Sequence, residues 1–207
     1  MINDVSRSRL TRTESQAQTR ERLLASARTQ VVRQGCGAAS VRDIAEAAGF
    51  SQGAFYSNFD SKEELLLELM RAHMADEVQT LTSFLKSEFN AAQTLAALER
   101  WTATMNDDAD WAMMAIELQL HANRNAEFAR EYDAVTAAHA AALGVLVERL
   151  FTALGKVPPD DQIATARGLM ALVHGLALQR APSKPDPSGV LVMTFLKALL
   201  ATAPNAV

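Results

Sequence analysis

The sequence predicts an all-α protein of about nine helices, and three observations support this fold class. Apolar residues recur at helical spacing along almost the whole 207-residue chain. No stretch sustains the two-residue alternation of a half-buried strand, and all six prolines lie at or beyond Pro158, so the first three quarters of the chain lack this helix breaker. With 49% hydrophobic and 21% charged residues, the composition is that of an ordinary globular protein.

Capping residues and glycines bound the first four predicted helices. Ser40 with Asp43 forms a capping box that opens the second helix, and Ser61 with Glu64 forms another that opens the fourth. Gly49 ends the second helix, since a glycine readily adopts the backbone conformation of a helix end. The four helices are expected over residues 15–34, 40–48, 51–59 and 61–85.

Breaks in the helical pattern divide the rest of the chain. They contain Asn, Asp, Gly or Pro residues and lie near Asn90 and over residues 106–110, 123–125, 155–161 and 181–189. The last two helices are expected over about 161–180 and 188–201. The connector between them is rich in proline, which suits an antiparallel helix pair.

Charge is distributed unevenly along the chain, although the net charge at pH 7 is only −4. The first 42 residues carry eight basic and three acidic side chains, so their net charge is +5 and that of the remainder is −9. A basic N-terminal part and an acidic body are typical of a small nucleic-acid-binding module joined to a larger domain with another task.

Residues 40–59 have the pattern of a helix-turn-helix. Ala45 and Ala48 are small where two helices must cross closely, and Gly49 stands where the turn favours positive φ. Phe55 and Phe59 share one face of the third helix and are expected to anchor it inward. The opposite face then carries short or polar groups that can approach base edges and phosphates.

The same region resembles the tetracycline-repressor (TetR) family of transcriptional regulators. The resemblance rests on Thr19-Arg20, on Ile44-Ala-Glu-Ala-Ala-Gly49, and on the run from Ser51-Gln-Gly through Phe55-Tyr-Ser-Asn-Phe59 into Ser61-Lys-Glu-Glu-Leu65. It covers roughly the first 65 residues. It implies a helix-turn-helix DNA-binding domain over 1–64, with the motif at 40–59, and a ligand-binding and dimerisation domain over 65–207.

The resemblance further implies a homodimeric repressor that is released from a palindromic double-stranded DNA operator by a small-molecule effector. Tyr56 and Lys62 are expected on phosphates, with Gln52 to Ala54 nearest the bases. Arg7, Arg9 and Arg12 could reach the minor groove or form a solvated tail. The expected DNA-binding residues are Ser40, Arg42, Ser51, Gln52, Gly53, Ala54, Tyr56, Ser57, Asn58 and Lys62.

The larger domain offers candidates for both of its expected tasks. Aromatic and methionine side chains beside polar ones suggest a pocket, in which His121 and Arg124 are candidates for holding an anionic group. The expected pocket residues are Trp101, Met105, Trp111, Met114, Glu117, His121, Arg124, Phe128 and His174, with Met113 and His139 nearby. Small residues on one helix and apolar residues on the next predict a dimer interface formed by Gly168, Ala171, Gly175, Val192, Phe195 and Leu199.

A helical-bundle enzyme and a purely protein-binding module are the alternatives. The bundle enzyme lacks its expected motifs: there is no paired Glu-x-x-His, no His-Glu-x-x-His, no cysteine pair and no Gly-x-Ser-x-Gly. We therefore expect no catalytic activity, no metal and no cofactor.

Cys36 is the single cysteine, which excludes an intrachain disulfide. The sequence shows no secretory or membrane-spanning apolar segment, so a cytoplasmic protein without membrane contact is expected.

Overall fold

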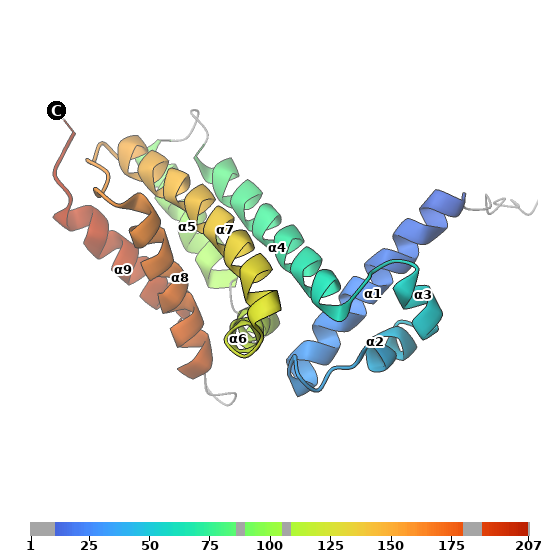
Figure 1. Cartoon of the computed structure of the whole chain (residues 1–207). Coiled ribbons are helices and arrows are strands. Elements are labelled where there is room, and N and C mark those ends of the chain that lie inside the picture. Colours follow the sequence, from blue (N-terminus) through green and yellow to red (C-terminus); the bar gives the residue numbers. More distant parts are fainter. Residues whose placement is uncertain (1–10, 86–89, 105–108, 180–187, 207) are drawn as a thin grey trace, which may run out of the picture. The chain divides into compact units, whose positions relative to one another are not determined.

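The computed structural model describes residues 11–85, 90–104, 109–179 and 188–206, and every extended regular element within these ranges is an α-helix (Figure 1). An isolated bridge pairs Lys156 with Asn205. The all-α prediction is confirmed, and the described residues form nine helices. These are α1 (Arg12–Gln34), α2 (Val41–Ala47), α3 (Gln52–Tyr56), α4 (Lys62–Phe84), α5 (Ala91–Thr104), α6 (Ala109–Ala122), α7 (Ala126–Ala153), α8 (Gln162–Gln179) and α9 (Ser188–Thr202).

Two helix bounds differ from those expected. Helix α1 begins at Arg12 rather than near residue 15, because Thr11 and Glu14 form a capping box that satisfies the first backbone amides. Helix α3 has only five residues and ends at Tyr56, although Phe59 still donates its backbone N–H to the carbonyl of Phe55. The proline-rich connector before α9 lies outside the described residues.

The chain forms two compact units, Met1–Leu69 and Met70–Val207, and α4 continues from the first into the second. A domain boundary after residue 64 stays a prediction. In the first unit, α1 packs on α2 and α2 on α3. The core of this unit consists of side chains with almost no solvent exposure, among them Leu23, Ala27, Val31, Ile44, Ala45, Phe55, Phe59, Leu65 and Leu66.

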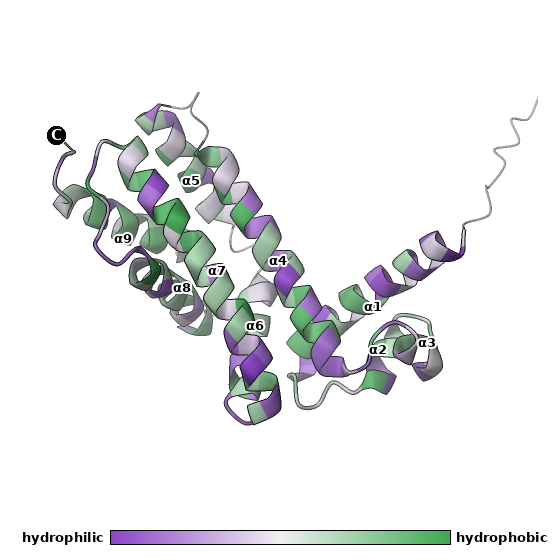
Figure 2. Ribbon diagram, turned by 45° about the horizontal axis from the view of Figure 1, so that its top comes forward, coloured by the Kyte–Doolittle hydropathy of each residue, from purple (hydrophilic) through white to green (hydrophobic). Residues whose placement is uncertain are grey.

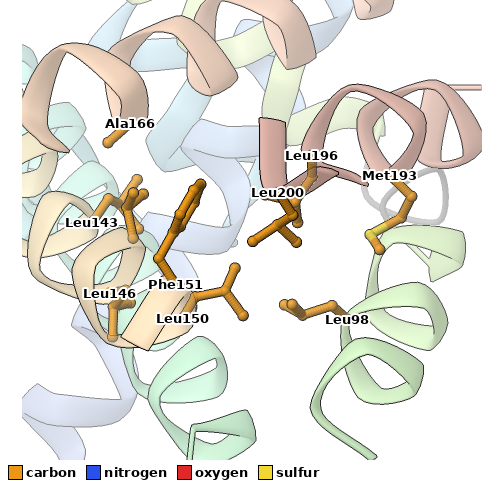
Figure 3. Packing of buried hydrophobic residues seen from close by; sticks show 10 residues of the cluster. Leu98, Leu143, Leu146, Leu150, Phe151, Ala166, Met193, Leu196 and Leu200 are labelled. Carbon is orange, nitrogen blue, oxygen red and sulfur yellow. The ribbon is translucent and has the colours of Figure 1, made fainter. Parts of the chain in front are cut away.

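In the second unit, α7 packs against α6 and α8, while α9 packs against α5 and α8. Figure 3 shows the buried side chains of α5, α7, α8 and α9 converging on one core. The core includes Leu98, Leu143, Leu146, Leu150, Phe151, Ala166, Met193, Leu196 and Leu200. Half of the apolar part of α7 is buried. This explains why α7, alone among the described helices, is long and apolar enough by length and composition to cross a bilayer.

Candidate nucleic-acid interface and ligand cavity

A short turn over residues 48–51 joins α2 to α3. Gly49 has φ +79°, a conformation that side-chain-bearing residues rarely adopt, and its N–H donates to the carbonyl of Glu46 at 3.0 Å. The next amide, of Phe50, donates to the carbonyl of Ala45 at 2.8 Å. Ala45 and Ala48 are buried, as the close crossing of the two helices requires. The turn therefore has the conformation that the helix-turn-helix pattern predicts.

Two phenylalanines anchor α3 from beneath. Phe55 and Phe59 are both buried, with ring centroids 5.6 Å apart. Tyr56 packs edge-on against Phe55 at 5.4 Å but keeps 56% of its surface exposed. The predicted inward anchoring is confirmed. The outer face is left with exposed Gln52, Gly53, Tyr56 and Ser57, and with half-buried Ala54 and Asn58.

Arg20 of α1 braces the segment after α3. Its guanidinium forms a two-point ion pair with Glu68, donates to the backbone carbonyl of Asn58, and lies 4.0 Å from the centroid of the Phe59 ring. The hydrogen bonds to Glu68 raise the pKa of Arg20. This bracing function was missed from the sequence, because Glu68 is 48 residues away and has no local pattern with Arg20.

Several expected DNA-binding residues make hydrogen bonds within the first unit. Ser40 caps α2 and donates to Asp43 Oδ2 at 2.6 Å; hydrogen bonds from the Ser40 side chain and then its amide lower the pKa of Asp43. Ser51 caps α3 by accepting from the amide of Ala54 at 3.2 Å. Arg42 pairs with Glu46 at 2.8 Å on the exposed face of α2. These side chains hold the local backbone, and their contact with DNA stays a prediction.

Lys62, at the start of α4, also makes hydrogen bonds within the first unit. Its ammonium donates to the backbone carbonyls of Cys36 at 2.8 Å and Ala39 at 3.0 Å. A lysine ammonium has three donors, so these two bonds leave one N–H for a phosphate. The expected phosphate contact remains a prediction, but Lys62 also fixes the segment between α1 and α2.

The net charge of the first unit is lower than the +5 counted over residues 1–42. Counted over Met1–Leu69, nine basic residues meet nine acidic ones, so this unit is neutral overall. The acidic residues after Arg42 include Asp43, Glu46 and Glu68, each engaged by a hydrogen bond or ion pair within the unit. Ending the count at residue 42 therefore overstated the basic character. The N-terminal half of α1 still shows mainly hydrophilic residues in Figure 2.

The second unit contains a partly open cavity of about 790 Å³ lined by residues of α4 to α9. Three of the nine expected pocket residues line it, namely Trp101, Trp111 and His174. The other described residues of that set do not: Met114 and Phe128 are buried in the core, His121 lies edge-on to Phe128, Glu117 is half-buried and Arg124 is exposed. Met105 lies outside the described residues. Neither His121 nor Arg124 lines this cavity, and their binding of an anionic group stays a prediction.

Helix α4 contributes a wall of the cavity that the sequence did not predict. Met70, His73, Met74 and Glu77 recur at helical spacing and line it. His73 stacks on Trp111 of α6 with ring centroids 3.8 Å apart. These residues resemble an ordinary helix face in the sequence, so no local signal distinguishes them from core positions.

A polar cluster lies within the mainly apolar lining. His139 Nε2 is 3.1 Å from the carboxylate of Glu77, and only 4% of the His139 side chain is exposed. His139 Nδ1 is buried and has no hydrogen-bond partner. Burial lowers the pKa of nearby His174, an effect that Glu77 partly opposes. Tyr132 donates to Gln119 at 3.1 Å, and burial raises the pKa of its phenol to about 12.

Most of the expected dimer-interface residues lie on the surface of the single chain. Gly168, Ala171, Phe195 and Leu199 are exposed and Gly175 is half-buried, whereas Val192 is buried within its own unit and lines the cavity. Further apolar side chains on α8 and α9 are exposed, namely Ile163, Leu178 and Val190. Helix α9 is hydrophobic over most of its length in Figure 2.

Residues 23–69 match the model of the family described as bacterial regulatory proteins, tetR family. An HTH-type transcriptional repressor, KstR2 of Rhodococcus jostii, is 36% identical over 86 residues, which are 42% of this chain and 42% of that protein. The match thus spans less than half of the relative's length.

Solved structures of similar fold cover most of the chain. Reduced NemR of E. coli is 21% identical and covers 89% of this chain and 98% of that one, with a TM-score of 0.69. FadR of Bacillus subtilis, solved with stearoyl-CoA, is 19% identical and covers 87% and 97%, with the same TM-score. The N-terminal part of the chain therefore matches the tetR family of bacterial regulatory proteins, and the chain as a whole shares the fold of these solved structures.

Proposed function

We propose that the protein is a transcriptional repressor that binds a palindromic DNA operator as a homodimer and is released when a small molecule occupies the cavity of the second unit. The observation that carries this proposal is the outer face of α3. It presents small and polar groups to solvent on a helix that Phe55 and Phe59 anchor firmly from beneath. Such a face suits entry into the major groove. A regulator of this kind works beside the DNA, in the cytoplasm.

Helix α4 provides a physical route for release. Its first two turns hold Lys62 and Glu68, which bind other residues of the first unit, and its later turns line the cavity with His73 and Glu77. A ligand that binds better when α4 has shifted would favour a dimer whose two α3 helices no longer match successive grooves. A nearly complete switch needs about 5.5 kcal/mol of differential affinity.

Footprinting of the purified protein on random duplexes and on the DNA flanking its own gene tests the proposal. We expect protection of an inverted repeat, with an affinity that falls steeply as salt is raised. Tyr56→Phe should weaken binding about two- to tenfold by removing a phosphate hydrogen bond. Tyr132→Phe, which changes the chain's other tyrosine, should leave operator affinity unchanged. Salt-insensitive binding, or protection without an inverted repeat, would contradict the proposal.

A further inference from the structure

We propose that the cavity binds an uncharged, largely apolar molecule that carries a hydroxyl group, and that this hydroxyl pairs with Nδ1 of His139. The inference rests on the proposed function, because it names the chemical class of the effector. Three features of the cavity support it: an imidazole that is paired on one side only, the balance of charges on the wall, and the size and chemistry of the lining.

The imidazole of His139 has one nitrogen satisfied and one unsatisfied. Nε2 faces the carboxylate of Glu77 at 3.1 Å, and in a neutral imidazole whose proton is on Nε2 the other nitrogen, Nδ1, is an acceptor. Nδ1 is buried and unpartnered, on a side chain that lines the cavity. A buried polar atom without a partner is costly, so a ligand that donates to Nδ1 gains affinity from this site. A hydroxyl is a donor of suitable size and carries no charge.

The charges on the cavity wall oppose an anionic ligand. The charged and titratable groups that line it are His73, Asp76 and Glu77 of α4, Tyr132 and His139 of α7, and Arg167 and His174 of α8. Asp76 and Arg167 are exposed, which leaves Glu77 as the partly buried carboxylate. Burial keeps the pKa of His174 below its ordinary value of 6.5, so this imidazole is neutral at pH 7. An anion near His139 would therefore face Glu77 without a full compensating charge.

A cationic ligand is also disfavoured, although less strongly. Glu77 already faces Nε2 of His139 at 3.1 Å, and a cation would have to leave water for a mainly apolar space. The volume of about 790 Å³ lies in the range of pockets that hold drug-sized ligands. Trp101, Trp111 and Met74 on its wall offer rings and a flexible thioether to an apolar body.

Four matched probes test the inference on the full-length protein without DNA. They are para-hexylphenol, para-hexylanisole, para-hexylbenzoate and para-hexylphenyltrimethylammonium. Both tryptophans of the chain, Trp101 and Trp111, line the cavity, so their fluorescence reports binding. We expect the phenol to bind about fivefold to tenfold more tightly than the anisole, which lacks the donor. The benzoate and the ammonium ion should bind more weakly than the phenol.

Two variants identify the residues responsible. His139→Phe should remove the preference for the phenol over the anisole, whereas His121→Phe, outside the cavity, should keep it. Glu77→Gln is nearly isosteric and removes the negative charge, so the benzoate should bind more tightly to it than to the original protein. This second variant gives a result even if His139→Phe fails to fold.

Equal affinities for phenol and anisole, or tightest binding of the benzoate or the ammonium ion, would overturn the inference. The operator assay separates this failure from failure of the proposed function. If the protein shows the expected selectivity but does not bind an operator, the ligand class stands and the proposed repressor function is wrong. If it binds an operator but lacks the selectivity, the repressor function stands and the ligand class is wrong.

Discussion

Replacing Gly53 with alanine should stabilise α3 but weaken its proposed contact with DNA. A Cβ added there would meet only Ser51 Oγ, at an ordinary contact distance of 3.7 Å. Gly53→Ala should therefore fit the fold and raise the free energy of unfolding by up to about 1 kcal/mol. The methyl group should lower operator affinity, because it stands on the face proposed to approach the bases. Urea unfolding and gel-shift titration measure the two effects.

Gly37→Ala is the matched control, since a Cβ there meets nothing within 4 Å and the residue lies outside α3. Its operator affinity should equal that of the original protein. If Gly53→Ala also bound the operator with unchanged affinity, α3 would not approach DNA at this residue.

His174 should make stability depend on pH. Burial lowers its pKa in the folded state, so as the pH falls below about 6.5 the unfolded chain takes up a proton before the folded chain does. The free energy of unfolding should therefore fall on acidification through this range, and the effect should level off below the folded-state pKa. Above the ordinary pKa both states are neutral, and this contribution does not change.

The measurement is urea unfolding of the original protein and of His174→Gln between pH 5 and pH 8, a range set around the ordinary histidine pKa of about 6.5. The variant should lose less stability on acidification. Parallel pH profiles for the two proteins would show that His174 has no such effect.

Helix bounds were largely predictable because local groups determine them. Ser40 and Asp43 cap α2 as expected, and Gly49 has the positive φ that the turn requires. The start of α1 was misplaced although Thr11 and Glu14 have the same capping spacing. The wall that α4 contributes to the cavity was not predictable. His73 contacts Trp111 of α6 and Glu77 contacts His139 of α7, and both partners lie far along the chain.

Two glycines on α8 and α9 should respond oppositely to substitution. A Cβ on Gly189 would lie 2.1 Å from the carbonyl oxygen of Thr102, so Gly189→Ala must separate α9 from α5. We expect a loss of about 1–3 kcal/mol in the free energy of unfolding. Gly168→Ala meets nothing within 4 Å and should be neutral or stabilising in the folded unit. Denaturant unfolding of both variants measures the difference, and equal effects would contradict a close α5–α9 contact at Gly189.

At the scale of the whole molecule, the spacing predicted apolar residues for a dimer interface on α8 and α9, and most but not all of them lie on the surface of the single chain. The exposed positions of Phe195 and Leu199 agree with the α9 apolar face that the spacing indicated. Val192 belongs to the same helical pattern yet is buried, because a helix covered by α5 and α8 has more than one inward-facing row. Helical periodicity identifies apolar faces, whereas the choice between core and partner requires the packed structure.

Dimerisation should depend on the exposed apolar residues of α8 and α9. Phe195 is 53% exposed and Leu178 is 61% exposed, and such apolar surface favours burial against a partner. Phe195→Glu should place a charge in that contact and give a monomer by light scattering, while Leu120→Glu on α6 should not. Two linked α3 helices bind two half-sites with far higher avidity than one, so the monomer should lose most operator affinity. A dimeric Phe195→Glu protein with full operator affinity would place the subunit contact elsewhere.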